Sequence, residues 1–121
     1  MKLLHLRPVL WVPDVRASVD WYVQTLGFSE RAFSEEGQWA SLGRDSIELM
    51  LALPNAHLPA GEPQFTGSFY FATDDVEGYW NRLQHCATLV YPIETFEWGM
   101  REFAIRDPNG YILQFGQEVQ P

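Results

Sequence analysis

The sequence predicts a small α+β protein made of two similar βαβββ halves that share one core. Three observations predict it: a one-domain length, two stretches in which a strand leads into a capped helix and then strands, and one constant spacing between these stretches. The 121 residues are 46% hydrophobic and 20% charged, which is typical of a globular chain. Halves of about 60 residues bury too little surface to fold separately. We expect one domain over 1–121, with modules at 4–53 and 66–118 and a linker at 54–65.

The first half begins with a strand and a helix. The run 8–12 is rich in β-branched and aromatic residues and ends at Pro13, after which Asp14 is a good helix N-cap. Apolar residues then recur at helical spacing: Val15, Val19, Tyr22 and Leu26. Gly27 follows where a helix C-terminal glycine often lies. The pattern predicts a helix over 15–26.

Two further strands are expected at 38–42 and 46–51, joined by a tight turn at Gly43-Arg44-Asp45. The segment 54–63 contains three prolines and a glycine, so we interpret it as a loop near the midpoint of the chain.

The second half repeats this order. The alternating aromatic run 68–73 predicts a strand, Asp74-Asp75 a helix cap, and Val76, Trp80 and Leu83 a helix. The tetrapeptide Asp107-Pro108-Asn109-Gly110 is a strong turn signal between strands at 101–106 and 111–116.

A spacing of 61 residues relates the halves. It aligns Asp14 with Asp75 and Val15 with Val76. The identity between the halves is weak, but the element order is the same twice, and this favours an internal repeat. The alternative is an α+β domain whose halves match by chance.

Charge and composition restrict the partners. Eight basic and 16 acidic residues give a net charge of −8, which repels phosphate backbones and attracts cationic small molecules. Cys86 is the single cysteine, so no intrachain disulfide is possible. No apolar window is long enough for a membrane span, and the N-terminus lacks a signal-peptide pattern. We expect a cytoplasmic protein that binds neither nucleic acid nor membrane.

Two segments carry a family resemblance. The first is the opening VLWVPDVRAS over 9–18 with Trp21-Tyr22 and the Leu26-Gly27-Phe28 that follows; the second is WGMREF over 98–103 with RDPNG over 106–110. They resemble the vicinal oxygen chelate superfamily, which includes glyoxalase I, bleomycin-resistance proteins, extradiol dioxygenases and fosfomycin-resistance thiol transferases. The closing segment is most similar to the bleomycin-resistance branch. The resemblance spans about residues 5–117 and implies two βαβββ modules whose curved sheets form a cup, usually in a homodimer.

The resemblance also implies positions for metal ligands. In metal-dependent members, inward-facing residues on four strands hold the ion, and the matching positions here are Arg7, Glu48, Ser68 and Gln114. Arginine has no lone pair to donate, and serine and glutamine are weak ligands. His5, two residues before Arg7, would add only a second good ligand to Glu48. We therefore expect no metal and no other cofactor.

Strand alternation suggests which other side chains line the cup. Trp11 shares a face with Arg7, Met50 with Glu48, and Tyr70 with Ser68, while Trp98 and Glu102 lie near the closing hairpin. The expected ligand-binding residues are Arg7, Trp11, Trp39, Glu48, Met50, Ser68, Tyr70, Trp98, Glu102 and Gln114. Two alternatives stay open: the indoles of Trp11 and Trp39 belong to the core, and Arg7 with Glu48 forms a buried ion pair.

No catalytic motif identifies a reaction. Adjacent residues on a helix diverge by about 100°, so His85 and Cys86 cannot form a nucleophile–base pair, and we expect Cys86 to be a small buried thiol.

Three functions fit the sequence. The first is a metal-independent binding protein, resembling bleomycin-resistance proteins, that sequesters an aromatic or cationic ligand in a dimer-interface groove and so confers antibiotic resistance. The second is a metal-dependent lyase, isomerase, thiol transferase or dioxygenase of the same superfamily. The third is a metal-free enzyme that uses Glu48, with a raised pKa, as a general base.

Overall fold

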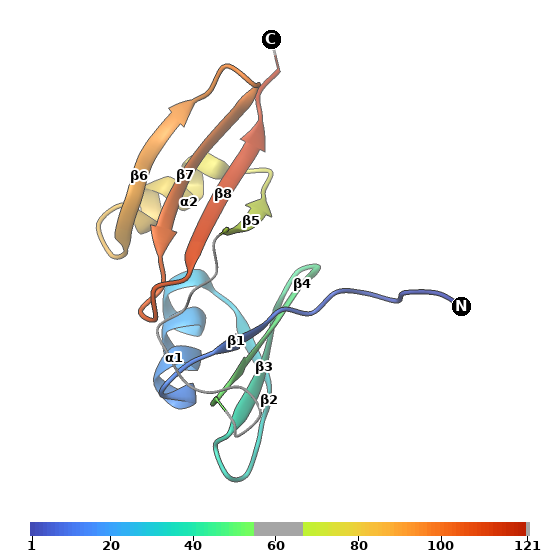
Figure 1. Ribbon diagram of the computed structural model, residues 1–121. Helices are drawn as coiled ribbons and strands as arrows, with labels where there is room; N and C mark the ends of the chain where they lie inside the picture. The colour runs from blue at the N-terminus through green and yellow to red at the C-terminus, as the bar shows by residue number, and fades with distance from the viewer. Residues whose placement is uncertain (55–66, 121) are drawn as a thin grey trace. The chain divides into compact units, whose positions relative to one another are not determined.

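The computed structural model describes residues 1–54 and 67–120 of the chain. The chain divides into two compact units, Met1–Gly61 and Glu62–Pro121, here called the first and second module. Each module contains one four-stranded mixed sheet and one helix (Figure 1), which confirms the α+β class and the two βαβββ units. Apart from Pro54, the predicted linker 54–65 lies outside the described residues, as does His57.

The first module contains β1 (Val9–Trp11), α1 (Val15–Leu26), β2 (Ser29–Phe33), β3 (Trp39–Arg44) and β4 (Ile47–Ala52). The strand order is β1-β4-β3-β2, with β1 parallel to β4 and the other pairs antiparallel. A βαβββ chain produces this order because the helix returns the chain beside β1 in the parallel sense.

Helix α1 has the predicted bounds. The side chain of Asp14 accepts a hydrogen bond from the Ala17 amide at 3.0 Å, and Gly27 ends the helix with φ 74°. The predicted apolar stripe is buried and contacts β3 and β4. Alternate residues of the strands complete the core beneath it: Leu10, Ala40, Leu42, Leu49 and Leu51.

The predicted turn at Gly43–Asp45 is wrong in position. Strand β3 continues through Arg44, and the chain turns at Asp45, whose φ is 52°. Gly43 serves another purpose: the Arg31 guanidinium lies over it, and a Cβ at this position would collide with that group. The glycine therefore permits a close approach within the sheet rather than a turn.

The second module contains β5 (Phe69–Ala72), α2 (Val76–Leu83), β6 (Thr88–Thr95), β7 (Met100–Arg106) and β8 (Ile112–Glu118). Its strand order, β5-β8-β7-β6, is that of the first module. Matching hydrogen bonds join Val12 N to Ala52 O and Thr73 N to Gly116 O, both at 2.9 Å. Val12 and Thr73 are one repeat spacing apart, so the repeat is a property of the fold and not a chance match.

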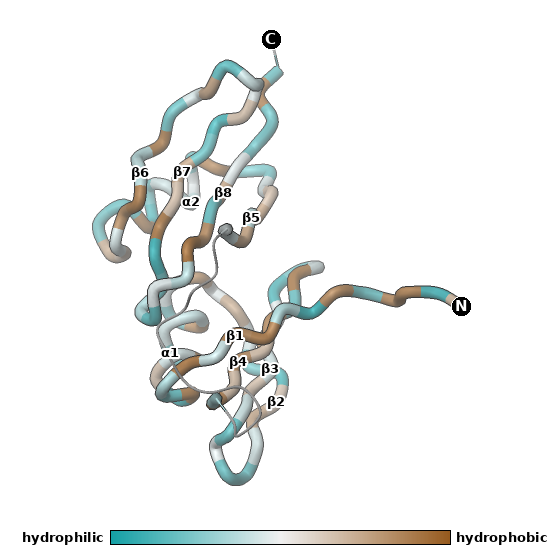
Figure 2. The backbone as a smooth tube through the Cα atoms, in the orientation of Figure 1, coloured by the Kyte–Doolittle hydropathy of each residue, from teal (hydrophilic) through white to brown (hydrophobic). Residues whose placement is uncertain are grey.

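Alternation along the strands separates two faces of the second sheet, and Figure 2 shows the changes of hydropathy along them. One face packs on α2 through aromatic pairs: Trp80 with Phe103, at 5.3 Å between ring centroids, and Tyr79 with Phe115, at 5.1 Å. The side chain of Asp75 caps α2 by accepting from the Gly78 amide. The opposite face carries the polar side chains described below.

Two features differ from the sequence prediction or add to it. Cys86 is exposed and not buried, because it follows the end of α2 and its thiol reaches only the Arg82 carbonyl. Neither helix in the described part of the chain is long and apolar enough to cross a membrane.

Candidate functional site

The polar face of the second sheet is built from two adjacent rows of cross-strand neighbours. One row runs Tyr70, Gln114, Ala104, Tyr91 across β5, β8, β7 and β6. The next row runs Ala72, Gly116, Glu102, Glu94 across the same strands. Each row contains residues with small side chains, Ala104 in the first and Ala72 and Gly116 in the second, and these leave room for longer side chains to reach across the sheet.

The first row holds a chain of neutral hydrogen bonds. Gln114 donates from Nε2 to the Tyr91 hydroxyl at 2.8 Å, across the small side chain of Ala104. Ser68 donates to the amide oxygen of the same glutamine. Two of the predicted site residues, Ser68 and Gln114, are therefore joined to each other and to Tyr91.

The Tyr70 side chain reaches from the first row into the second. Its hydroxyl lies over Gly116, where a Cβ would collide with it, and beside the Glu102 carboxylate. The Tyr91 hydroxyl also lies beside this carboxylate. Burial raises the pKa of both tyrosines, and the adjacent Glu102 carboxylate raises each further. Both hydroxyls therefore keep their protons at neutral pH.

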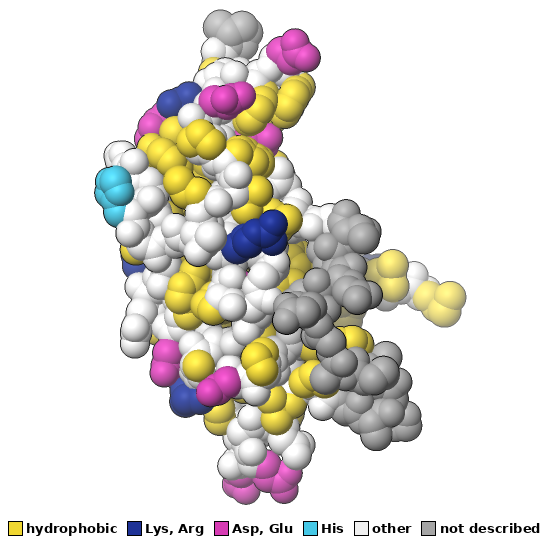
Figure 3. All heavy atoms as spheres, turned by 60° about the vertical axis from the view of Figure 1, so that its left-hand side comes forward, with side chains coloured by type: hydrophobic (Ala, Val, Ile, Leu, Met, Phe, Trp, Pro, Cys, Tyr) yellow, Lys and Arg dark blue, Asp and Glu magenta, His cyan; other side chains and the backbone are white. Residues whose placement is uncertain are grey.

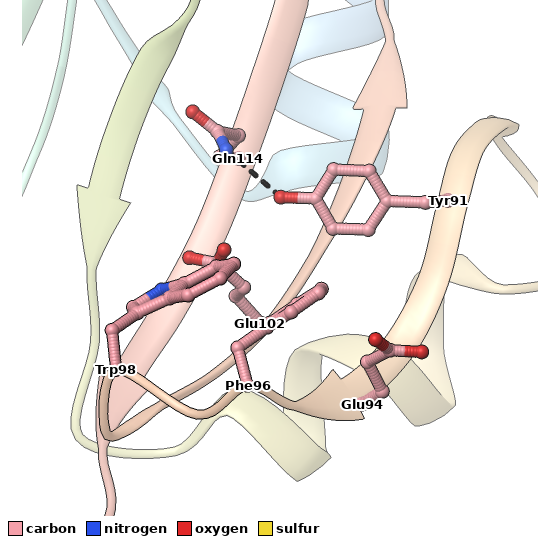
Figure 4. Close-up of a pocket in the computed structure, with 6 residues that line it drawn as sticks. All are labelled: Tyr91, Glu94, Phe96, Trp98, Glu102 and Gln114. Atoms are coloured by element: carbon pink, nitrogen blue, oxygen red, sulfur yellow. Dashed lines mark hydrogen bonds between the residues drawn. The ribbon is translucent and has the colours of Figure 1, made fainter.

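A pocket of about 370 Å³ opens on this face. The Phe96 and Trp98 rings stack at 4.5 Å and 10°, and Tyr91 meets the edge of Phe96 at 5.9 Å. Figure 4 shows these rings, the Glu102 carboxylate and the Gln114–Tyr91 hydrogen bond together. The lining residues are Tyr91, Glu94, Phe96, Trp98, Glu102 and Gln114. This is an aromatic pocket with few polar groups, the composition typical of organic-ligand sites.

The pocket is acidic. Glu102 is only 5% exposed, and no described lysine or arginine of the second module forms an ion pair with it. Glu94 adds a second carboxylate at the exposed margin. The charged groups of the pocket thus carry a single sign.

The first module carries a different polar cluster. Arg7 donates to Glu48 Oε2 from Nε at 3.2 Å and from Nη2 at 3.0 Å, and Arg31 donates to Oε1 at 3.3 Å. His5 Nδ1 lies 3.8 Å from the same carboxylate. The pair of Arg7 and Glu48 is partly exposed and not buried, with 38% and 33% of the side chains accessible.

The charge on Glu48 is held by its partners. The hydrogen bond from Arg7 lowers the pKa of Glu48, and Arg7, His5 and Arg31 lower it further by their charge. The prediction of a general base with a raised pKa is therefore wrong, because the lowering effects of these neighbours together outweigh the raising effect of burial.

The remaining predicted residues of the first module lie on the exposed face of its sheet. Trp11 and Trp39 flank Ala52 on neighbouring strands, and they are 36% and 40% exposed. The alternative that they belong to the core is wrong. Met50 lies one step along β4, between Val9 and Ser41. On the face drawn in Figure 3, hydrophobic side chains reach the surface in several groups between charged ones.

The structure thus groups the predicted residues by module. The first module contains Arg7, Trp11, Trp39, Glu48 and Met50, and the second contains Ser68, Tyr70, Trp98, Glu102 and Gln114. Sequence reasoning missed Arg31, Tyr91 and Glu94, which lie on the two strands that it did not locate. Pro92 interrupts the apolar run of β6, although proline is tolerated there because β6 is an edge strand.

The four implied ligand positions do not fit a divalent metal. Arg7 has no lone pair to offer, and both carboxylate oxygens of Glu48 are occupied by arginines. Ser68 and Gln114 hydrogen-bond each other. Within the described ranges, no three His, Cys, Asp or Glu residues come together in a way that could hold a metal ion.

Comparisons with known proteins bear on this site. The family model described as "Glyoxalase/Bleomycin resistance protein/Dioxygenase superfamily" matches residues 2–115. No curated protein matches the sequence significantly.

Solved structures share the fold. TnmS3, an antibiotic binding protein from Streptomyces sp. CB03234, is 25% identical with a TM-score of 0.79, over 98% of this chain and 99% of that chain. TioX from Micromonospora sp. ML1 is 20% identical with a TM-score of 0.81, over 96% and 99%. Lactoylglutathione lyase from Agrobacterium tumefaciens is 17% identical with a TM-score of 0.71, over 94% and 92%. A binding protein and an enzyme thus share this fold, so the fold alone does not decide between them.

Proposed function

The chain belongs to the glyoxalase/bleomycin resistance protein/dioxygenase superfamily, and from that membership we propose that it is a metal-independent small-molecule-binding protein. It sequesters an aromatic or cationic ligand in a groove of a homodimer. The observation that carries the proposal is the aromatic, acidic pocket of the second module.

The aromatic wall supplies affinity in this proposal. The Trp98 side chain is 60% exposed although it is stacked on Phe96, so one face of the indole is open to a flat ligand. Covering an aromatic ring removes apolar surface from water and adds a stacking interaction. Glu94, Glu102 and Gln114 supply polar groups that orient the ligand.

Three further observations support a binder. The four implied metal positions have no suitable ligand set, as described above. The antibiotic binding recorded for TnmS3 shows that this fold serves a binding protein elsewhere. Superfamily members commonly bind small ligands and form dimers, and large apolar side chains remain exposed on this chain, including Leu89 and Val90. Binding alone protects a cell from a toxic compound, so antibiotic resistance needs no catalytic group here.

A thermal-shift screen tests the proposal. Cationic antibiotics and aromatic metabolites are added to the purified protein with and without divalent metals, and we expect a raised Tm that does not depend on metal. A stoichiometric Zn, Ni, Mn or Fe content, or binding that requires one of these ions, would favour the metal-dependent enzyme. Light scattering of the same samples measures the oligomeric state, and a monomer would contradict the dimer.

Matched tryptophan variants locate the binding site. Trp98→Ala is expected to weaken a hit about tenfold or more, whereas Trp21→Ala, which removes an indole of α1 that is not among the expected ligand-binding residues, leaves the affinity within about twofold. Circular dichroism verifies that both variants fold. Equal weakening by both substitutions, or by neither, would show that the second-module pocket is not the binding site.

A further inference from the structure

Glu102 is the unusual group of the second module. The residue is only 5% exposed, and it lines an open pocket. Burying a carboxylate is unfavourable unless a cation or several donors compensate for the lost water. The groups beside it in the second module include the neutral hydroxyls of Tyr70 and Tyr91.

Two tyrosine side chains from other strands of the sheet lie on either side of the Glu102 carboxylate. Tyr70 reaches it from β5 only because Gly116, the neighbour of Glu102 on β8, has no side chain. Tyr91 approaches it on the same face from β6 and is held by Gln114. Hydroxyls thus flank the carboxylate on two sides, and no described lysine or arginine of the second module forms an ion pair with it.

The open side of the carboxylate faces aromatic rings. Phe96 and Trp98 stack beside it, and Glu94 lies at the pocket margin (Figure 4). Aromatic faces attract cations, and they do so most strongly where water is excluded. A buried carboxylate beneath aromatic walls is therefore complementary to an organic cation.

We propose that Glu102 is the counter-ion for a protonated amine on an aromatic ligand, and that Tyr70, Tyr91 and Gly116 position it for this role. The inference rests on the proposed function and narrows its ligand to molecules with both an aromatic body and an ammonium group. The ammonium donates to the carboxylate oxygens that the tyrosines leave free, and the aromatic body lies against Trp98. A hydrated metal ion fits this site poorly, because calcium needs six to eight oxygen ligands and the wall is apolar.

Three probes of one shape test the charge preference on the wild-type protein. They are 1-naphthylmethylamine, 1-naphthalenemethanol and 1-naphthoate, which are cationic, neutral and anionic at pH 7. Titration calorimetry measures each affinity, and indole N–H signals in NMR report the Trp98 environment. We expect the amine to bind about tenfold or more tightly than the alcohol, with the carboxylate weakest.

Two matched variants test the residue. Glu102→Gln keeps the shape and removes the charge, and it is expected to reduce amine binding to the level of the alcohol while alcohol binding changes less than about twofold. Glu94→Gln makes the same change at the pocket margin and is expected to lower amine affinity only slightly, because an exposed charge is screened. Gly116→Ala displaces the Tyr70 hydroxyl and is expected to weaken the amine selectively.

The outcomes separate the two proposals. Equal binding of the amine and the alcohol to wild-type protein would overturn the counter-ion role while leaving the binding function intact. Loss of amine preference in Glu94→Gln but not in Glu102→Gln would also overturn it. If none of the three probes and no compound of the antibiotic screen binds, the binding function itself is overturned. If CaCl₂ binds in competition with the amine, the pocket is a metal site instead.

Discussion

The two modules have one topology and opposite surface chemistry. On the first sheet, a charged network joins Arg7, Glu48 and Arg31 at a partly exposed surface. On the second, a neutral network joins Ser68, Gln114 and Tyr91 beside a buried carboxylate. Both networks start just before the strand that precedes the helix, pass through the last strand of the module and end on the edge strand of the outer hairpin. The repeated backbone thus determines which positions each network connects, and the side chains at these positions determine whether the network is charged or neutral.

The modules differ in how the negative charge of the carboxylate, Glu48 or Glu102, is compensated. Glu48 has two arginines in hydrogen-bond contact, so its charge is compensated within the module. Glu102 lies beside tyrosine hydroxyls, and it has no ion-pair partner among the described residues of its own module. This difference is why we assign the proposed cationic ligand to the second module.

The largest expected difference between the modules is in the stability lost when the glycine beneath a long side chain, Gly116 or Gly43, is replaced by alanine. Gly116→Ala would displace the Tyr70 hydroxyl from a buried carboxylate, and we expect a loss of about 1–3 kcal/mol in the free energy of unfolding. Gly43→Ala displaces the end of the flexible Arg31 side chain and should cost about 0.5 kcal/mol or less. Urea unfolding measures both. Equal costs would mean that Tyr70 contributes no more to its module than Arg31 does.

Neutralising each acid should change stability in opposite directions. Glu48→Gln leaves two arginines without their carboxylate, so Tm should fall slightly. Glu102→Gln removes an uncompensated buried charge and keeps an oxygen that accepts from Tyr70, so Tm should stay unchanged or rise. Thermal unfolding at pH 7 measures both variants. A marked fall of Tm in Glu102→Gln would show that its charge is already compensated in the folded protein.

The smallest contrast appears only at extreme pH. The pKa of Glu48 is lowered from 4.5, so its contribution to stability is present above pH 4.5 and is lost as the pH falls through the lowered pKa. The pKa values of Tyr70 and Tyr91 are raised from 10.0, so their contribution is present below pH 10 and is lost as the pH rises further.

Two variants test whether Glu48 causes the loss of stability in acid and whether Tyr70 contributes to the loss in alkali. Tm measured against pH should fall less steeply in acid for Glu48→Gln, and less steeply in alkali for Tyr70→Phe, than for the wild type. Each variant should follow the wild type at the other limit. A Tyr70→Phe curve that matches the wild type above pH 10 would refute the contact between Tyr70 and Glu102.

The elements with strong local signals were predicted well. The α1 bounds followed from Asp14, the apolar spacing and Gly27, and the turn at Asp107 followed from its proline, asparagine and glycine. Edge strands β2 and β6 were not located, because both are irregular and largely exposed: each contains a bulge, and Pro92 interrupts β6. Local sequence carries little information about such strands, since their pairing depends on a neighbour that is distant in the chain.

The candidate site was predicted in part for the same reason. Ser68, Tyr70, Glu102 and Gln114 were expected to line one surface, and the structure links Ser68 and Gln114 to Tyr91 by hydrogen bonds and places Tyr70 and Tyr91 beside Glu102. Tyr91 could not be placed because its strand was missed. The close approach of Tyr70 to Gly116 could not be predicted either, because a glycine within a strand gives no information about which side chain lies over it.

The exposed thiol of Cys86 offers an experimental handle on the assembly. Because the sequence has a single cysteine and this one is accessible just beyond α2, a maleimide dye attaches to one defined point of the second module without any engineering. Energy transfer between donor- and acceptor-labelled copies then reports whether chains associate, and whether adding 1-naphthylmethylamine changes the distance between their second modules.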